Sequence, residues 1–182
     1  MSLVARSSVV AALLLAACGG SSKKDAPAPA IATLVPADGA VAGWTRSGLL
    51  RILPAATAGL GAGSGGVNGD ADPFVPRGLV QLAIQRYAKS SQQLELRIWQ
   101  MRDAAAEADV WSYLTTSEPR YSGANWSVQA IGEAGRISDT GTYWWLVARK
   151  GAYTVEATIQ PDDAAARTEV IAFLGAVVAG IP

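Results

Sequence analysis

Acidic and aromatic side chains are the groups of this 182-residue chain that could do chemistry, because the sequence contains no histidine. Without an imidazole, Ser-His and Cys-His relays are excluded, and so are most zinc sites. The chain has one cysteine and therefore cannot form an internal disulfide. Its 15 basic residues balance its 15 acidic residues, which argues against a nucleic-acid partner.

Paired carboxylates could perform general acid-base catalysis if two of them faced each other across a groove, roughly 5 to 10 Å apart. The available acidic residues include Asp103, Glu107, Asp109, Asp162, Asp163 and Glu169. Asp103, Asp162 and Asp163 precede predicted helices, where the helix dipole stabilises a negative charge. This structural role explains them, so we expect a protein that is not an enzyme and keep a carboxylate-dependent hydrolase as an alternative.

Two short motifs match ligand sites only in part. Asn68, Asp70 and Asp72 have the spacing of the first three ligands of a calcium loop, but the glycine at its sixth position and the glutamate at its twelfth are missing. The glycine-rich stretch 59–66 contains GxGxxG, with no predicted strand before it and no predicted helix after it. Turns and a flexible loop explain both motifs better. We therefore expect neither a metal ion nor a cofactor.

Aromatic residues of the predicted strands suggest a binding surface. Trp99, Tyr143 and Trp145 alternate with core positions, so they point to the second face of the sheet. Two interpretations remain open. In the first, the segment around Trp44 and residues 49–53, or the helices, cover this face. In the second, the three aromatic side chains form an exposed strip flanked by Glu95, Arg97 and Glu156, and such patches usually mark binding sites.

Two hairpins, each followed by a helix, predict the fold. Residues 79–88 and 93–101 alternate apolar and polar side chains, and residues 142–149 and 152–160 flank a tight turn at Lys150-Gly151. Asp103 can cap the helix after the first hairpin, and Asp162 or Asp163 the helix after the second. The run Asp103-Ala-Ala-Ala recurs at Asp163. We expect an α+β domain in which an antiparallel sheet carries a layer of helices, as an α/β sandwich.

The N-terminus has the features of an export signal. Arg6 precedes an apolar run, residues 9–17, that is too short to span a bilayer. Leu15-Ala16-Ala17-Cys18 resembles the lipobox of bacterial lipoproteins, in which the cysteine sulfur receives a diacylglycerol. The resemblance implies a signal peptide at 1–17 and a membrane anchor at Cys18 with acyl chains such as palmitate.

The residues after Cys18 predict the location and the start of the folded domain. Gly19 stands where an inner-membrane retention signal often has aspartate, which favours the outer membrane, facing the periplasm or the cell surface. Residues 18–30 comprise the lipidated cysteine and a stretch rich in Gly, Ser, Lys and Pro that predicts a disordered tether. A single domain at 31–182 remains.

Four short motifs in this domain resemble an uncharacterised domain of bacterial lipoproteins, over most of residues 36–160. They are Gly43-Trp44, residues 67–71, Gln85-Arg86-Tyr87, and residues 95–103 with the Ala-rich helix after them. The resemblance implies no activity, and the order of elements also looks like the PsbP-like α/β sandwich. We expect a binding or scaffolding module with an envelope protein as its partner. A small-molecule or lipid carrier, with an apolar cavity between helices and sheet, is the alternative.

Overall fold

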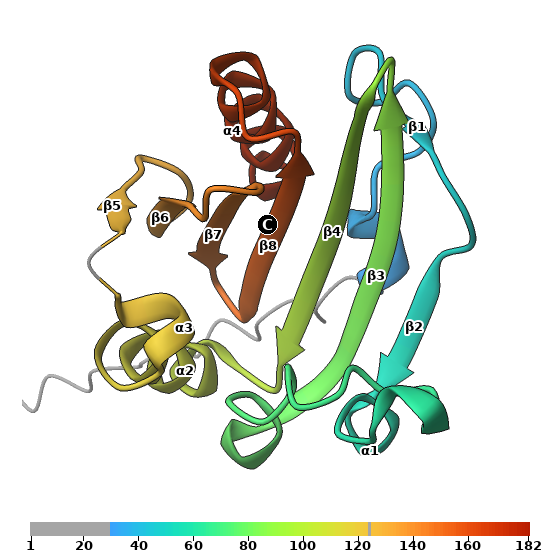
Figure 1. Ribbon diagram of the computed structural model, residues 1–182. Helices are drawn as coiled ribbons and strands as arrows, with labels where there is room; N and C mark the ends of the chain where they lie inside the picture. Colours follow the sequence, from blue (N-terminus) through green and yellow to red (C-terminus); the bar gives the residue numbers. More distant parts are fainter. Residues whose placement is uncertain (1–29, 124) are drawn as a thin grey trace, which may run out of the picture.

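One antiparallel sheet forms the body of the protein (Figure 1). The structure, a computed structural model, describes residues 30–123 and 125–182. Within these residues the strand order is β1-β3-β4-β8-β7-β6-β5, and β2 also pairs with β3. The strands are β1 (Thr45–Arg46), β2 (Arg51–Pro54), β3 (Leu79–Lys89), β4 (Gln92–Met101), β5 (Trp126–Val128), β6 (Ala134–Asp139), β7 (Trp144–Lys150) and β8 (Tyr153–Gln160). The helices are α1 (Ala55–Ala58), α2 (Ala104–Thr116), α3 (Pro119–Ser122) and α4 (Ala164–Ala179), with 3-10 turns η1 (Ile31–Leu34), η2 (Ala62–Ser64) and η3 (Val75–Arg77).

The two predicted hairpins, β3-β4 and β7-β8, are the centre of the sheet. β4 pairs with β8, so that Leu96 lies opposite Ala157, which in turn lies opposite Leu146. The second turn is Gly151-Ala152, one residue later than predicted, because Lys150 pairs with Tyr153. This shift changes the register by two residues and therefore leaves every side chain on its predicted face.

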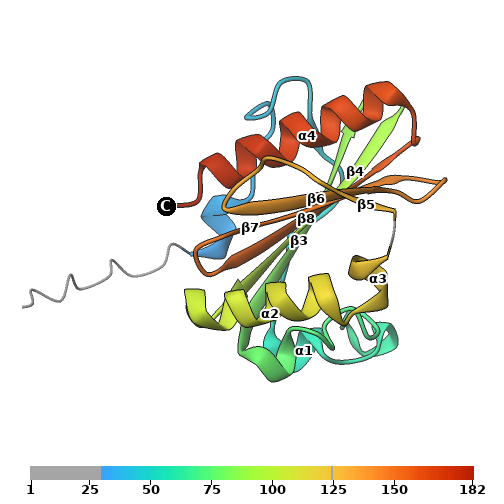
Figure 2. The same ribbon diagram turned by 90° about the vertical axis from the view of Figure 1, so that its left-hand side faces the viewer.

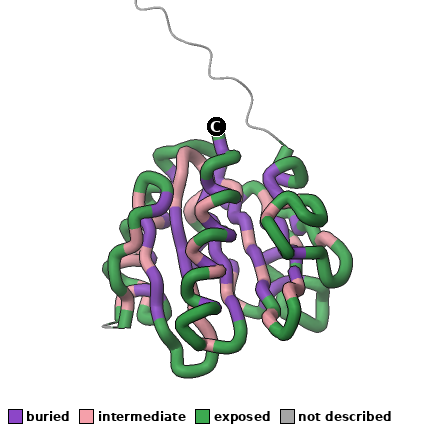
Figure 3. The backbone as a smooth tube through the Cα atoms, turned by 90° about the horizontal axis from the view of Figure 1, so that it is seen from above, coloured by how far each residue is buried: buried purple, intermediate pink, exposed green. Residues whose placement is uncertain are grey.

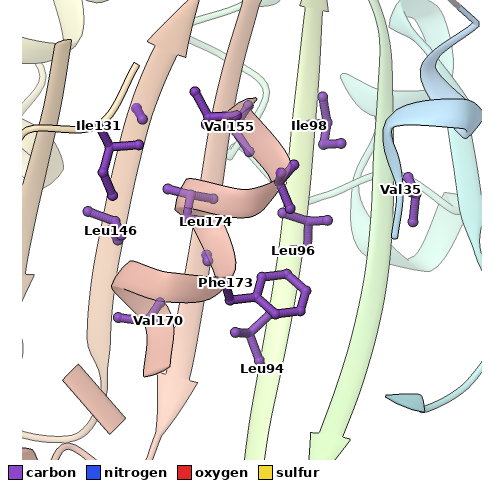
Figure 4. Packing of buried hydrophobic residues seen from close by; sticks show 14 of the residues in the cluster. Val35, Leu94, Leu96, Ile98, Ile131, Leu146, Val155, Val170, Phe173 and Leu174 are labelled. Atoms are coloured by element: carbon purple, nitrogen blue, oxygen red, sulfur yellow. The ribbon is translucent and has the colours of Figure 1, made fainter. Parts of the chain in front are cut away.

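Helices cover both faces of the sheet, where the sequence predicted one helix layer (Figure 2). On one face α4 packs Val170, Phe173 and Leu174 against Leu94 and Leu96 (Figure 4). On the other face α2 packs Val110 and Leu114 in the cluster that contains Trp99. β8 is buried at nearly every position because it is covered from both sides. The predicted α+β class and α/β sandwich are confirmed, with a second layer of helix added.

Trp44 lies on the α4 face, where its ring meets Phe173 with a centroid distance of 5.6 Å. The segment around Trp44 therefore does not cover Trp99; residues of α2 do, as the other part of the first interpretation predicted. Leu53 of β2 does belong to the α2-side cluster. Seen from above, the strands are mainly buried, whereas the loops and the outer side of α4 are exposed (Figure 3).

The predicted signal peptide, Cys18 and nearly all of the tether lie outside the described residues. Among the helices that the structure describes, none has the length and the apolar character needed to cross a membrane.

Both long helices begin at the predicted aspartate. The carboxylates of Asp103 and Asp163 accept hydrogen bonds from the amides of Ala106 and Ala166, each at 2.7 Å. Each side chain thereby satisfies an amide that has no partner within the helix.

We predict that Asp163→Ala lowers the free energy of unfolding by about 1 kcal/mol, the usual effect of removing an N-cap side chain. Chemical denaturation followed by circular dichroism measures this difference. Asp162→Ala is the matched control, because the Asp162 side chain makes no capping bond to α4. Equal stability of the two variants would contradict the capping role.

Candidate functional site

A cavity of about 320 Å³ opens on the sheet face that carries α2 and α3. Its lining residues are Asp70, Glu95, Arg97, Arg120, Tyr121, Tyr143, Trp145, Glu156 and Thr158. The sheet register brings them together, since Glu95 lies opposite Thr158 and Thr158 opposite Trp145. All three side chains therefore point to the same face. This volume is at the lower end of the range for small-molecule sites.

Alternating charges cross this cavity as a chain of ion pairs. The chain runs Arg86, Glu95, Arg97, Asp70, Arg120, Glu118. The Arg97 guanidinium donates to Glu95 through Nε at 2.9 Å and to Asp70 through Nη1 at 2.6 Å. Arg120 donates through Nη1 to the other oxygen of Asp70, at 2.8 Å. The chain thus ties β4, the loop before η3, and α3 together across the mouth of the cavity.

Glu156 is buried at the base of the site, with 3% of its surface exposed. The Tyr121 hydroxyl donates a hydrogen bond to its Oε1 at 2.9 Å. Burial raises the pKa of Glu156, because the charged form loses its hydration, although Arg97 opposes this shift. Burial and the neighbouring Glu156 also raise the pKa of Tyr121 well above its ordinary value. The pair is therefore neutral over a wider pH range than free side chains are.

The surroundings of the site shift the pKa values of Glu95 and Arg97 in the directions that keep both side chains charged. Burial alone would raise the pKa of Glu95, but Arg97 and Arg86 together lower it. Burial alone would lower the pKa of Arg97, but Glu156, Asp70 and Glu95 together raise it. Both groups are charged at neutral pH, and Glu156 is the carboxyl group of the site that favours its neutral form.

α3 reaches the site because of its local sequence. Glu118 accepts a hydrogen bond from the Arg120 amide, and Pro119 occupies the first turn, where no amide is needed. The backbone carbonyls of Arg120 and Tyr121 accept hydrogen bonds from Trp126 at 2.9 Å and Arg136 at 3.0 Å. These contacts place Arg120 and Tyr121 over the sheet.

The predicted aromatic strip is divided in the structure. Trp99 is completely buried and stacks on Phe74 at 4.0 Å between ring centroids, so its predicted place in an exposed strip is wrong. Tyr143 and Trp145 are half-buried and line the cavity. Trp145 contacts the Tyr121 ring at 4.7 Å, which makes an aromatic wall. Glu95 and Arg97 are half-buried in the cavity wall, whereas Glu156 lies beneath them and does not flank the site at the surface.

The partial calcium motif serves a different purpose. Asp70 is engaged by Arg97 and Arg120, so its oxygens do not converge on a cation with Asn68 and Asp72. In the part of the chain that the structure covers, no group of three or more acidic, histidine or cysteine side chains could hold a metal ion. The glycine-rich stretch folds around η2, and a Cβ at Gly66 would lie 1.9 Å from the Leu60 carbonyl oxygen. Glycine is needed there for close packing.

Arg120, Tyr121 and Thr158 are the lining residues that the sequence did not single out. The dipeptide Glu118-Pro119 is a helix-start signal that could have located α3. Nothing in the spacing indicates that α3 contacts strands β6 and β8, which come later in the chain. Asp70 was singled out for a different role, and Thr158 shares a face of β8 with Glu156 by strand alternation.

A second buried carboxyl group, Glu107 of α2, lies away from the cavity and has no exposed surface. It accepts hydrogen bonds from the Thr154 hydroxyl and from Arg149 Nη1, both at 3.1 Å. Burial raises the pKa of Glu107 to about 7, although Arg149 opposes the shift.

Comparison with known proteins found no similar protein. No family model matches the chain, and neither a curated protein nor a solved structure matches it. The resemblance to the lipoprotein domain therefore stays a prediction, and the functional argument depends on the geometry of the site.

We predict that the free energy of unfolding falls as pH rises from 5 to 8. The folded state keeps a proton on Glu107 to about pH 7, whereas the unfolded chain releases it near 4.5, so deprotonation favours unfolding. Glu107→Gln should reduce this fall by up to about 3 kcal/mol, measured by denaturation at each pH. It should not abolish the fall, because the raised pKa of Glu156 acts in the same direction.

The control for this pH dependence is Asp109→Asn, an exposed carboxylate on the same helix. The free energy of unfolding of Asp109→Asn should change with pH as that of the parent protein does. A parent protein that becomes more stable between pH 5 and 8 would contradict the assignment.

Proposed function

We propose that the protein is a lipid-anchored, non-catalytic binding module of the bacterial cell envelope that takes a small polar ligand in the cavity around Arg97. The observation that carries this proposal is a set of hydrogen-bonding groups, on residues that line the cavity, that have no protein partner. Among the described residues, Arg97 Nη2, the Tyr143 hydroxyl and the Thr158 hydroxyl make no hydrogen bond and remain accessible to solvent. Such groups are the ones that a ligand can satisfy.

The fixed carboxylates support binding in preference to catalysis. Asp70 and Glu95 each have both oxygens engaged by arginine, which holds them in place and spreads their charge. A general base needs a lone pair aimed at the proton that it removes. A rigid, pre-organised set of donors and acceptors suits recognition, because little ordering is needed when the ligand arrives.

The cavity also favours a polar ligand over the other partners that the sequence suggested. An envelope protein bound through an aromatic strip would use Trp99, which is buried. A lipid carrier would need an apolar cavity between helices and sheet, and this cavity is lined by two arginines and three carboxyl groups. We therefore prefer a small polar ligand to either of them.

The anchor proposed at Cys18 has its own test. Cys18→Ser should shift the protein from the membrane fraction to the soluble fraction and abolish incorporation of radiolabelled palmitate, because the sulfur that takes the lipid is lost. Ser21→Ala is the matched control and should remain in the membrane fraction. Equal membrane association of both variants would contradict the lipid anchor.

The binding site is tested with two groups of probes and the full chain. The charged group is glutamate, lysine and inorganic phosphate, and the neutral group is glucose, maltotetraose and chitotetraose. We expect at least one probe to bind the parent and Thr158→Ser, and to bind Thr158→Phe at least tenfold more weakly, because the phenyl ring fills the cavity. Ligand-observed NMR and calorimetry measure binding.

Thr168→Phe, on the exposed side of α4, is the control for the added ring. Circular dichroism verifies the folding of each variant, and Thr158→Val replaces Thr158→Phe if the larger residue disrupts the sheet. Failure of all six probes to bind, or equal binding to Thr158→Phe, would overturn this site.

A second candidate function, a carboxylate-dependent hydrolase, is favoured by one observation. Glu95 and Glu156 lie diagonally on adjacent strands, where Cα atoms are roughly 7 to 8 Å apart. Their surroundings shift their pKa values in opposite directions. Such a pair can supply an acid and a base. Cleavage of a bound probe that is lost in Glu156→Gln would establish the hydrolase, whereas binding without cleavage supports the module.

A further inference from the structure

Three cavities lie next to one another around Glu95 on the α2 side of the sheet, and together we call them the groove. The cavity around Arg97 shares Tyr143 and Thr158 with a second cavity of about 410 Å³, and it shares Arg97 with a third of about 580 Å³. Glu95 lines all three. The third extends to the glycine-rich stretch at Gly66. Together the three cavities offer more space than one small molecule needs, which suits a chain of linked units.

The floor of the groove offers side chains and no backbone. β4 is paired with β3 and β8, and β8 is paired with β4 and β7, so the backbone amides and carbonyls of both strands are already used. An extended peptide gains its affinity from pairing with a free strand edge, which neither β4 nor β8 offers. The groove is therefore better suited to a ligand that bonds through its own side groups.

The walls offer hydrogen-bond donors and acceptors next to aromatic rings. Arg97 Nη2 is a donor, the carboxylates of Asp70 and Glu95 are acceptors, and the Thr158 hydroxyl is both. Tyr121, Tyr143 and Trp145 supply the aromatic surface. Hydroxyl groups on a ring with apolar C–H faces match this combination, since each hydroxyl both donates and accepts.

The charges of the ion-pair chain balance, and Arg51, which lines the third cavity outside this chain, donates to the Gly65 carbonyl. The ion-pair chain contains Arg86, Arg97 and Arg120 against Glu95, Asp70 and Glu118, and every member has an opposite neighbour. An anionic or cationic ligand would bring an unbalanced charge to these paired groups. A neutral ligand brings none.

We infer that the groove binds a neutral carbohydrate chain of several sugar rings, with one ring held against Trp145 and Tyr143 and its hydroxyls bonded by Arg97 and Thr158. This inference rests on the proposed function and names the chemical class of its ligand. Each cavity takes one part of the chain, so a tetrasaccharide has more contacts than a single sugar.

The test titrates maltotetraose, cellotetraose, chitotetraose and glucose into the full chain by calorimetry, at 50 mM and at 500 mM NaCl. We expect at least one tetrasaccharide to bind at least tenfold more tightly than glucose. Its affinity should change less than twofold between the two salt concentrations, because screening acts on charges. A monosaccharide that binds as tightly as the tetrasaccharides would overturn the groove and favour a free sugar as ligand.

Variants that each lack one hydroxyl group test where the sugar binds. Tyr143→Phe and Thr158→Val should each weaken tetrasaccharide binding about fivefold, the equivalent of one hydrogen bond. Tyr113→Phe and Thr168→Val, away from the groove, should not change it. Equal affinities for all four variants would place the sugar elsewhere and overturn the inference.

The controls separate this inference from the proposed function. Binding of glutamate, lysine or inorganic phosphate at the cavity, with no binding of any saccharide, would overturn the carbohydrate and leave the proposed binding module in place. Binding of tetraalanine with no saccharide would replace the carbohydrate with a peptide. Failure of every probe would overturn both.

Discussion

The arrangement of the site depends on one side chain, Arg97. It lies opposite Glu156 in the sheet, bonds Glu95 of its own strand, and holds Asp70 of the loop before η3. Asp70 in turn holds Arg120 and with it α3. Because buried and half-buried carboxyl groups need a nearby cation, one guanidinium makes several otherwise unfavourable burials possible at once. The cavity is the space that remains around these fixed charges.

The Asp-Ala-Ala-Ala run, which occurs at Asp103 and at Asp163, begins a helix on each of the two faces of the sheet. Both aspartates cap their helices with the same 2.7 Å bond, yet α2 and α4 lie on opposite faces of the sheet. A half-turn about the normal to the sheet places the β3-β4 hairpin on the β7-β8 hairpin, because the two hairpins run antiparallel within the sheet. This rotation does not exchange the two faces of the sheet. It therefore leaves α2 on its own face and does not superpose it on α4. The cap follows β4 by two residues and β8 by three, and a one-residue difference reverses the face of a strand.

Sequence analysis located the elements that carry strong local signals and missed those that depend on distant contacts. Both central hairpins, both long helices and their caps follow from alternation, helical spacing and aspartates at helix starts. The short strands β1, β2, β5 and β6 have little pattern of their own and are ordered by pairing with the central strands. For the site, strand alternation placed Glu95, Arg97 and Trp145 on one face. It could not show that Phe74 covers Trp99, because that contact joins residues 25 positions apart.

The two ends of the described chain lie at the same end of the molecule. The blue turn η1, which begins at Ile31, and the C-terminus lie at one end, whereas α3 and the connection between β6 and β7 lie at the other (Figure 2). The cavity, with Tyr143 and Tyr121 on its wall, belongs to the far end. The anchor proposed at Cys18 would lie 13 residues before Ile31, a reach of at most about 45 Å. Such an attachment would leave the groove at the end of the domain that is farther from the attached segment, open to whatever polymer or solute fills the space around it.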